Sequence, residues 1–171
     1  RDGDGLLDGF EVKYGFNPLV AGEQSLDSDG DGLSNLREQQ LGTHPRQADS
    51  DADGLNDGAE VDQYNSDPLR EDTDLDRVLD NVEVANNANP RKADSDDDGI
   101  SDYEEINSYG TKANNADTDG DGLSDFIETK GPYEDILDPR NAADANQDYD
   151  QDGLTNKQEI LDTLTNPKVK D

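Results

Sequence analysis

The sequence predicts an array of short repeats with little regular secondary structure. Each repeat is expected to be an acidic loop followed by a short helix, and the repeats to stack as an elongated, solenoid-like rod. Three observations predict this fold class: a twelve-residue acidic pattern recurs along the chain, the step between copies is nearly constant, and apolar residues are scarce. Of the 171 residues, 29% are hydrophobic and 5% aromatic, too few for one large core. A conventional globular enzyme is therefore not expected.

The clearest copy of the pattern is residues 117–128, which read DTDGDGLSDFIE. Aspartates stand at positions 1, 3 and 5, glycine at position 6, an aliphatic residue at position 7, Asp or Asn at position 9 and Glu at position 12. Seven copies can be aligned on these positions, and the first is truncated because it lacks position 1. The copies lie at residues 1–11, 27–38, 49–60, 72–83, 94–105, 117–128 and 148–159.

The spacing of the copies indicates one structural unit per step. From the second to the sixth copy the first aspartates lie 22 or 23 residues apart, and the seventh copy follows after 31. The excess before the seventh copy predicts an inserted loop at residues 131–147, and a smaller excess at residues 20–26 precedes the second copy. We interpret residues 1–171 as a single repeat array, and the truncated first copy suggests a fragment of a longer protein.

Position 8 carries residues that favour the start of a helix, namely Ser34, Asn56, Ser101, Ser124 and Thr155. In the fifth and seventh copies, Glu or Gln three residues later completes a capping-box pattern. Glycine and proline soon follow, so each helix is expected to span only two or three turns. The segments before position 1, such as residues 44–48, are too short for the incoming helix of an EF-hand. The predicted unit is thus an EF-hand-like loop followed by one helix.

The loop spacing matches the pattern by which proteins surround Ca²⁺ with oxygen. Side chains at positions 1, 3 and 5, the carbonyl of position 7, a water held by position 9 and a bidentate Glu at position 12 together supply about seven oxygens. Mg²⁺ fits this set less well because it requires near-octahedral geometry. Zinc is disfavoured because the chain has no Cys and one His, His44. We expect several Ca²⁺ ions, at least one for each complete loop.

The candidate ligands are the residues at these positions in all seven copies. They are Asp2, Asp4, Asp8, Glu11, Asp27, Asp29, Asp31, Leu33, Asn35, Glu38, Asp49, Asp51, Asp53, Leu55, Asp57, Glu60, Asp72, Asp74, Asp76, Val78, Asp80, Glu83, Asp94, Asp96, Asp98, Ile100, Asp102, Glu105, Asp117, Asp119, Asp121, Leu123, Asp125, Glu128, Asp148, Asp150, Asp152, Leu154, Asn156 and Glu159. The fourth loop departs from the pattern, since Arg77 replaces the glycine of position 6, which predicts weaker binding or a distorted loop there.

The charge of the chain also points to cations. There are 44 acidic and 14 basic residues, giving a formal net charge of -30. Nucleic acid and anionic membrane surfaces would be repelled, and the sequence holds no apolar run long enough for a membrane span. Clustered carboxylates would also repel one another, so folding should be coupled to ion binding. A disordered acidic tail is the alternative, but it would require neither the aliphatic position 7 nor the fixed distance to Glu.

A series of DxDxDGLSDxxE loops with short connectors resembles thrombospondin type 3 repeats in the form found in bacterial secreted and surface proteins. The resemblance covers essentially the whole chain. It implies calcium-wrapped repeats that stand between a cell-surface anchor and a functional domain. Animal members carry disulfides between repeats, and this chain has no Cys. Its stability should therefore depend more strongly on calcium.

Two functions follow as hypotheses. The first is an extracellular or bacterial cell-surface spacer or stalk whose folding and rigidity depend on Ca²⁺, and whose partners are the flanking domains of the parent protein. The alternative is a calcium-dependent adhesion or self-assembly module that contacts another surface protein, a polysaccharide or a second copy of itself. Aromatic anchors for such contacts would be Tyr14, Phe16, Tyr64, Tyr109 and Tyr133. We expect these side chains to pack against the adjacent repeat instead, with Tyr133 the strongest candidate for an exception. No catalytic residues are predicted, because every clustered carboxylate has a role as a metal ligand.

Overall fold

The computed structural model describes residues 2–170, and within that range it contains short helices and no strand. The chain divides into two compact units. The first consists of residues up to Ala85 together with Asn89–Arg91, and the second of Asn86–Ala88 together with residues from Lys92 onward. The first unit holds the first four loops and the second holds the last three. A repeat array with few helices is thus confirmed.

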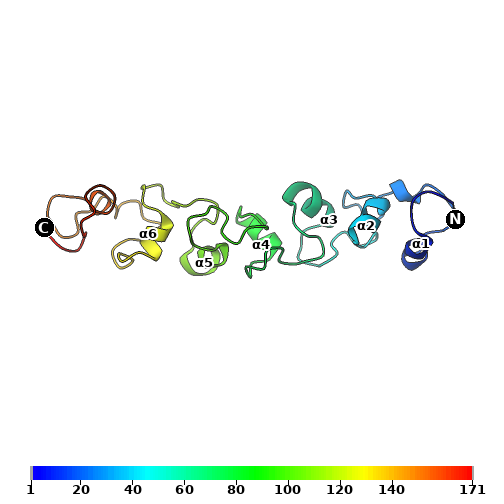
Figure 1. The fold of residues 1–171 in the computed structure, drawn as a ribbon, viewed down its shortest axis with the longest axis horizontal. Coiled ribbons are helices and arrows are strands. Elements are labelled where there is room, and N and C mark those ends of the chain that lie inside the picture. The colour runs from blue at the N-terminus through cyan, green and yellow to red at the C-terminus, as the bar shows by residue number, and fades with distance from the viewer. Residues whose placement is uncertain (1, 171) are drawn as a thin grey trace. The chain divides into compact units, whose positions relative to one another are not determined.

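Each α-helix follows an irregular loop, as Figure 1 shows. The first unit contains α1 (Asp8–Tyr14), the 3-10 turn η1 (Glu23–Ser25), α2 (Asn35–Leu41), α3 (Asp57–Ala59) continued by the π-helix η2 (Glu60–Tyr64), and α4 (Asp80–Ala85). The second contains α5 (Asp102–Glu104) continued by the π-helix η3 (Glu105–Tyr109), α6 (Asp125–Thr129) and the π-helix η4 (Gln158–Thr163). All six α-helices begin at position 9 of a complete or truncated loop, five of them with Asp and α2 with Asn35.

The predicted caps account for the helix starts. The side chains of Ser34, Asn56, Ser101 and Ser124 each accept a hydrogen bond from the backbone N–H three residues later. In the seventh copy, Thr155 Oγ1 accepts from Gln158 N at 3.3 Å and Gln158 Oε1 accepts from Thr155 N at 3.0 Å. This reciprocal pair is the capping box that the sequence predicts.

The π-helices explain the alternation between steps of 22 and 23 residues. A π-turn holds one more residue than an α-turn before the chain leaves the helix. The third and fifth copies contain η2 and η3, and both are followed by a 23-residue step. The second and fourth copies contain only α-helix, in α2 and α4, and are followed by 22-residue steps. The extra residue is therefore taken up inside the helix, and the connectors keep a similar length.

Small apolar centres are built on the side chain of position 7, which is buried in five repeats and half-buried in the third and seventh. Leu33, Ile100 and Leu123 are fully buried, and Val78 and Leu6 nearly so. In the second unit this centre is enlarged by the inserted segment, because Leu137 and Ala145 pack against Leu123. The apolar material is thus distributed along the repeats, as their composition requires.

Candidate metal centres

Every complete loop is closed by a backbone hydrogen bond across its base. The N–H of position 9 donates to the carbonyl of the residue just before position 1, as in Asn35 to Leu26 at 2.8 Å and Asp125 to Ala116 at 2.9 Å. Within the loop, the aspartate of position 1 accepts a hydrogen bond from the N–H of position 6. The six donors are Gly32, Gly54, Arg77, Gly99, Gly122 and Gly153, at 2.9 to 3.1 Å. These bonds curl the chain around the carboxylates.

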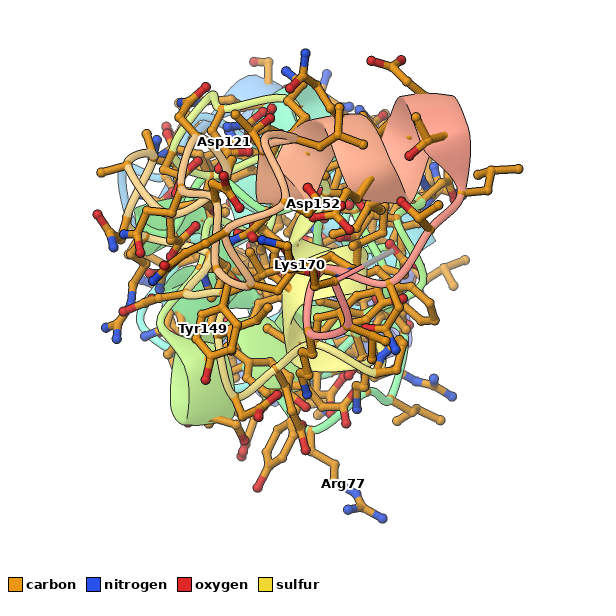
Figure 2. The ribbon with its side chains drawn as sticks, turned by 90° about the vertical axis from the view of Figure 1, so that its left-hand side faces the viewer. Arg77, Asp121, Tyr149, Asp152 and Lys170 are labelled. Atoms are coloured by element: carbon orange, nitrogen blue, oxygen red, sulfur yellow. The ribbon has the colours of Figure 1, made fainter. Side chains whose placement is uncertain are left out.

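The curl requires left-handed backbone at positions 4 and 6. Position 6 has φ between 88° and 109° in all seven loops, which lies beyond the left-handed minimum near 57° and favours glycine. Arg77 adopts this conformation with φ 88° and keeps the hydrogen bond to Asp72. Figure 2 shows its side chain extending away from the ribbon. The fourth loop therefore keeps the backbone conformation of the other loops and is not distorted. The cost of Arg77 is backbone strain.

Carboxylates converge inside the loops. In each of the first five loops, three acidic side chains offer oxygens that lie within 4.8 Å of one another. These groups are Asp2, Asp4 and Glu11; Asp27, Asp29 and Asp31; Asp49, Asp51 and Asp53; Asp72, Asp74 and Asp76; and Asp94, Asp96 and Asp98. The structure thus brings together the predicted ligands of positions 3 and 5 with position 1 or position 12.

The glutamates of position 12 are among the most deeply buried acidic groups of the chain. All seven are at most 1% exposed. Both carboxylate oxygens of Glu11, Glu38 and Glu128 are buried and accept no hydrogen bond from any described residue. A buried carboxylate without a donor or counter-charge is strongly disfavoured. Oxygens of this kind, aimed at a group of aspartates, fit a hard divalent cation such as Ca²⁺ and would be satisfied by it.

Burial and mutual repulsion raise the pKa values of these groups. Burial is the larger cause, and the aspartates of the same loop add to it. The pKa values of Glu38, Glu60 and Glu105 rise to about 8, and that of Glu128 to about 9. The pKa values of Asp51 and Asp96, at position 3, rise to about 6. The metal-free loops therefore favour protons, which a cation must displace.

Position 9 is buried in the six complete loops, and where it is Asp its carboxylate is held by position 2. The two oxygens of Asp57 accept from the N–H and the hydroxyl of Ser50, at 2.8 and 2.6 Å. The same pair of bonds joins Asp80 to Thr73 and Asp125 to Thr118. The hydroxyl at position 2 was not identified from the sequence, although Ser or Thr recurs there in five loops. A water-mediated role for position 9 in ion binding stays a prediction.

The amide of position 7 donates to the aspartate of position 5 in all seven copies. The N–H groups of Leu6, Leu33, Leu55, Val78, Ile100, Leu123 and Leu154 are 2.7 to 2.9 Å from this carboxylate. This bond holds the middle of each loop while the side chain of position 7 enters the apolar centre. Ligation by the carbonyls of position 7 stays a prediction.

The second oxygen of position 5 links neighbouring repeats. Asp31 Oδ2 accepts from Gly58 N at 3.0 Å, and Asp53 Oδ2 accepts from Asn81 N at 3.0 Å. Each donor is at position 10 of the next copy, in the first turn of its helix, where N–H groups lack partners within the helix. One aspartate therefore caps the following helix while its other oxygen holds its own loop. This contact was missed because backbone donors leave no mark in the sequence.

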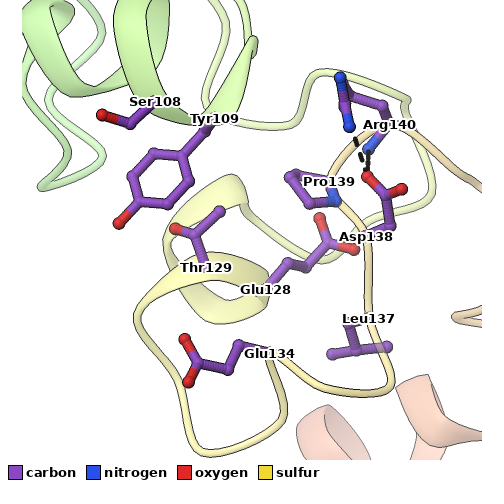
Figure 3. Close-up of a pocket in the computed structure, with 9 residues that line it drawn as sticks. All are labelled: Ser108, Tyr109, Glu128, Thr129, Glu134, Leu137, Asp138, Pro139 and Arg140. Carbon is purple, nitrogen blue, oxygen red and sulfur yellow. Dashed lines mark hydrogen bonds and ion pairs between the residues drawn. The ribbon is translucent and has the colours of Figure 1, made fainter.

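The aromatic residues considered as binding anchors pack within their own units. Tyr14 lies against His44 with ring centroids 4.7 Å apart, and Phe16 is buried. Tyr133 is half-buried and packs against the cluster around Leu123, and its role as an anchor stays a prediction. Figure 3 shows the neighbouring pocket, in which the side chain of Glu128 is directed toward the inserted segment that carries Leu137.

No helix in the described part of the chain is long and apolar enough to cross a membrane.

The family model described as Bacterial TSP3 repeat matches residues 1–21, 27–45, 49–71, 94–111 and 117–129, more than half of the chain. The fourth loop, with Arg77, and the seventh lie outside the matched stretches. The predicted family is thus confirmed.

One similar solved structure is titled "Biofilm associated protein - B domain". The aligned part is 42% identical and covers 26% of this chain and 11% of the other chain, with a TM-score of 0.25. A comparison with curated proteins finds no match.

Proposed function

Because the chain belongs to the family of bacterial TSP3 repeats, we propose that it is a calcium-built structural spacer whose folding and rigidity depend on Ca²⁺. The observation that carries this proposal is the burial of Glu at position 12 beside the loop aspartates. In each complete loop, positions 1, 3, 5, 7 and 12 hold at least one ion, with position 9 acting through water. Positions 3, 5, 9 and 12 of the truncated first copy contribute to one further site.

The dependence on calcium follows from the charge. Six doubly charged ions, one for each complete loop, add 12 positive charges to a chain with a formal net charge of -30. Without them, the buried carboxylates either repel one another or take up protons, and the small apolar centres offset little of this cost. The calcium-free chain is therefore loosely expanded, and the loaded chain, residues 1–171, forms one extended array.

Extracellular calcium suits such an array, because millimolar concentrations can fill many sites of moderate affinity. We therefore place the chain outside the cell or at a bacterial cell surface, where it separates flanking domains of its parent protein. An adhesive role is less well supported, because the five aromatic residues considered for it are buried or half-buried in their own units. The clustered carboxylates have a role as ligands and need no catalytic one.

Calcium titration with small-angle scattering tests the proposal. Metal-free chain should bind at least six ions by calorimetry, and its radius of gyration should change from that of an expanded chain to that of a stiff, defined particle. Magnesium at the same concentration serves as the control and should have a much smaller effect. Identical scattering curves with calcium and with chelator would refute the structural role, and the absence of calcium binding would refute the proposal as a whole.

A further inference from the structure

In every complete loop, an acidic residue occurs at one of two positions of the repeat. One is position 9, and the other lies four residues before position 1. In the four copies that follow a step of 22 or 23 residues, position 9 is Asp57, Asp80, Asp102 or Asp125, and the earlier position is Pro45, Pro68, Pro90 or Ala113. In the two copies that follow extra residues, position 9 is Asn35 or Asn156, and the earlier position is Glu23 or Asp144. Every complete loop therefore has one acid at one of the two positions.

The two asparagines are bound in the same way. Asn35 Nδ2 donates to the carbonyl oxygen of Glu23 at 2.7 Å, and Asn156 Nδ2 donates to that of Asp144 at 2.8 Å. In the second unit, Lys157 N also donates to the carbonyl oxygen of Ala145 at 3.0 Å. The acidic residue of the inserted segment is thus fixed against the first turn of the next helix.

Asp144 is buried deeply and uses only one of its oxygens. Asp144 is 4% exposed. Oδ2 accepts from Asp138 N at 2.9 Å and from Asn141 Nδ2 at 3.3 Å. Oδ1 is buried and receives no hydrogen bond from the described residues. A role limited to holding the inserted segment would need Oδ2 alone and would leave Oδ1 without a partner, at a cost of about 1 to 3 kcal/mol.

The carboxylates around Asp144 belong to the sixth loop. Burial is the main cause that raises the pKa values of Glu128, Asp119 and Asp144, and neighbouring carboxylates raise them further. Asp144 is one of the charges that act on Glu128 and Asp119, and Asp121 acts on Asp144. Glu128 is fully buried, and its two oxygens, like Asp121 Oδ2, have no hydrogen-bond partner among the described residues. Leu137 and Ala145 pack against Leu123 of this same loop and hold the segment in place.

We propose that Asp144 is a calcium ligand of the sixth loop, supplied by the inserted segment 131–147. Its Oδ1 joins the carboxylates of Asp119, Asp121 and Glu128 around one ion. The segment therefore completes the site of the preceding repeat, while Asn156 anchors it through a neutral amide. This inference rests on the proposed calcium binding. Glu23 has the corresponding place beside the first loop, where its charge acts on Glu11.

A site-resolved calcium titration of Asp144→Asn in the full chain tests the assignment. Calcium chloride is added to metal-free, ¹⁵N-labelled protein, and two backbone amides are followed by NMR. Gly122 N, which donates to Asp117 at 2.9 Å, reports the sixth loop, and Gly54 N, which donates to Asp49 at 3.1 Å, reports the third. The variant should need at least about tenfold more calcium to move the Gly122 resonance, with Gly54 unchanged. Asp138→Asn is the matched control, because this neighbouring carboxylate is exposed and pairs with Arg140.

The possible results separate the two proposals. If neither resonance of the unaltered protein responds to calcium, the proposed function fails. If both respond but Asp144→Asn titrates like the unaltered protein, calcium binding stands and the role of Asp144 is refuted. A variant in which Gly122 and Gly54 weaken equally, or in which Asp138→Asn has the same effect, also refutes it, because the loss would then be general and not that of one ligand.

Discussion

The junction between the second and third loops and the junction between the sixth and seventh connect similar repeats by different means. In the first, Asp31 caps the next helix directly through Gly58 N. In the second, the corresponding amide, Lys157 N, donates to Ala145 in the inserted segment, and Asp121 Oδ2 accepts no hydrogen bond from a described residue. The direct junction thus uses Oδ2 of the position 5 aspartate to hold the next helix, and the expanded junction leaves the corresponding oxygen of Asp121 without this bond.

The difference between the two junctions indicates how the array tolerates extra residues. An insertion would separate a helix from the aspartate that caps it, and the expanded junction replaces that cap with carbonyl groups of its own. Lys157 Nζ adds a bond to the carbonyl oxygen of Asp121 at 2.5 Å, which ties the seventh repeat to the sixth loop. The two junctions therefore maintain contact between neighbouring repeats with different donors and acceptors.

The largest expected effect is that of pH on the metal-free chain. The pKa values of Glu38 and Glu128 rise from 4.5 to about 8 and about 9 on burial. The fold therefore binds more protons than the unfolded chain does, and this stabilisation is fully present below about pH 4.5 and lost as pH rises toward 8 or 9. Metal-free protein should show more helix by circular dichroism at about pH 5 than at about pH 9.

Two further measurements sharpen this prediction. With calcium near half-saturation the pH dependence should reverse, because protons compete for the same oxygens. By carboxyl-detected NMR, the buried Glu38 and Glu128 should both titrate well above the ordinary glutamate pKa of 4.5. Helix content that increases with pH in metal-free protein would contradict the burial of these groups.

Gly58→Ala should break the direct junction. A Cβ at this position would lie 2.1 Å from the carbonyl oxygen of Asp31, so the neighbouring repeats would have to move apart. We expect a loss of about 1 to 3 kcal/mol in the free energy of unfolding, measured with urea in saturating calcium. Gly9→Ala is the matched control, since Gly9 occupies the same helical position with nothing within 4 Å. Equal stabilities of the two variants would show that the contact is not needed.

The sequence predicted the parts of this fold that depend on residue type at a fixed spacing. The caps, as at Ser34 and Thr155, and the burial of Leu33 and Leu123 follow from side chains that the pattern repeats. The grouping of loop aspartates follows from the same spacing. The family resemblance rested on these positions and was confirmed.

The parts that were missed depend on backbone donors or on residues outside the repeat. The bond between Asp31 and Gly58 joins residues 27 positions apart through an N–H that every residue except proline carries. The π-turn of η2 was visible only as a 23-residue step, which a longer connector would also explain. Asp144 lies in a segment without a repeat pattern, so its relation to Asn156 became clear only when their contact was known.

Asp31→Asn should separate the two uses of position 5. In the direct junction both oxygens accept hydrogen bonds, from Leu33 N and Gly58 N, and an amide can accept only one of them. We expect weaker calcium binding and an additional loss of about 1 to 3 kcal/mol in stability at saturating calcium. Asp121→Asn is the comparison in the expanded junction, where the loss of calcium affinity should come with less loss of stability. Equal stability losses would mean that the two junctions do not differ in this way.

The smallest expected effect concerns Arg77, within a loop and away from both junctions. Its φ of 88° lies in the left-handed region, which costs a non-glycine residue about 1 to 2 kcal/mol. Glycine removes this strain but has more freedom in the unfolded chain, so Arg77→Gly should stabilise the calcium-loaded protein by about 1 kcal/mol. The amide resonance of Val78 should respond at a lower calcium concentration.

Leu75→Gly is the control at position 4, where other loops accept Ala52, Asp97 and Gln151. Its gain in stability should be smaller than that of Arg77→Gly. An unchanged response of Val78 in Arg77→Gly would mean that strain at position 6 does not limit ion binding in the fourth loop.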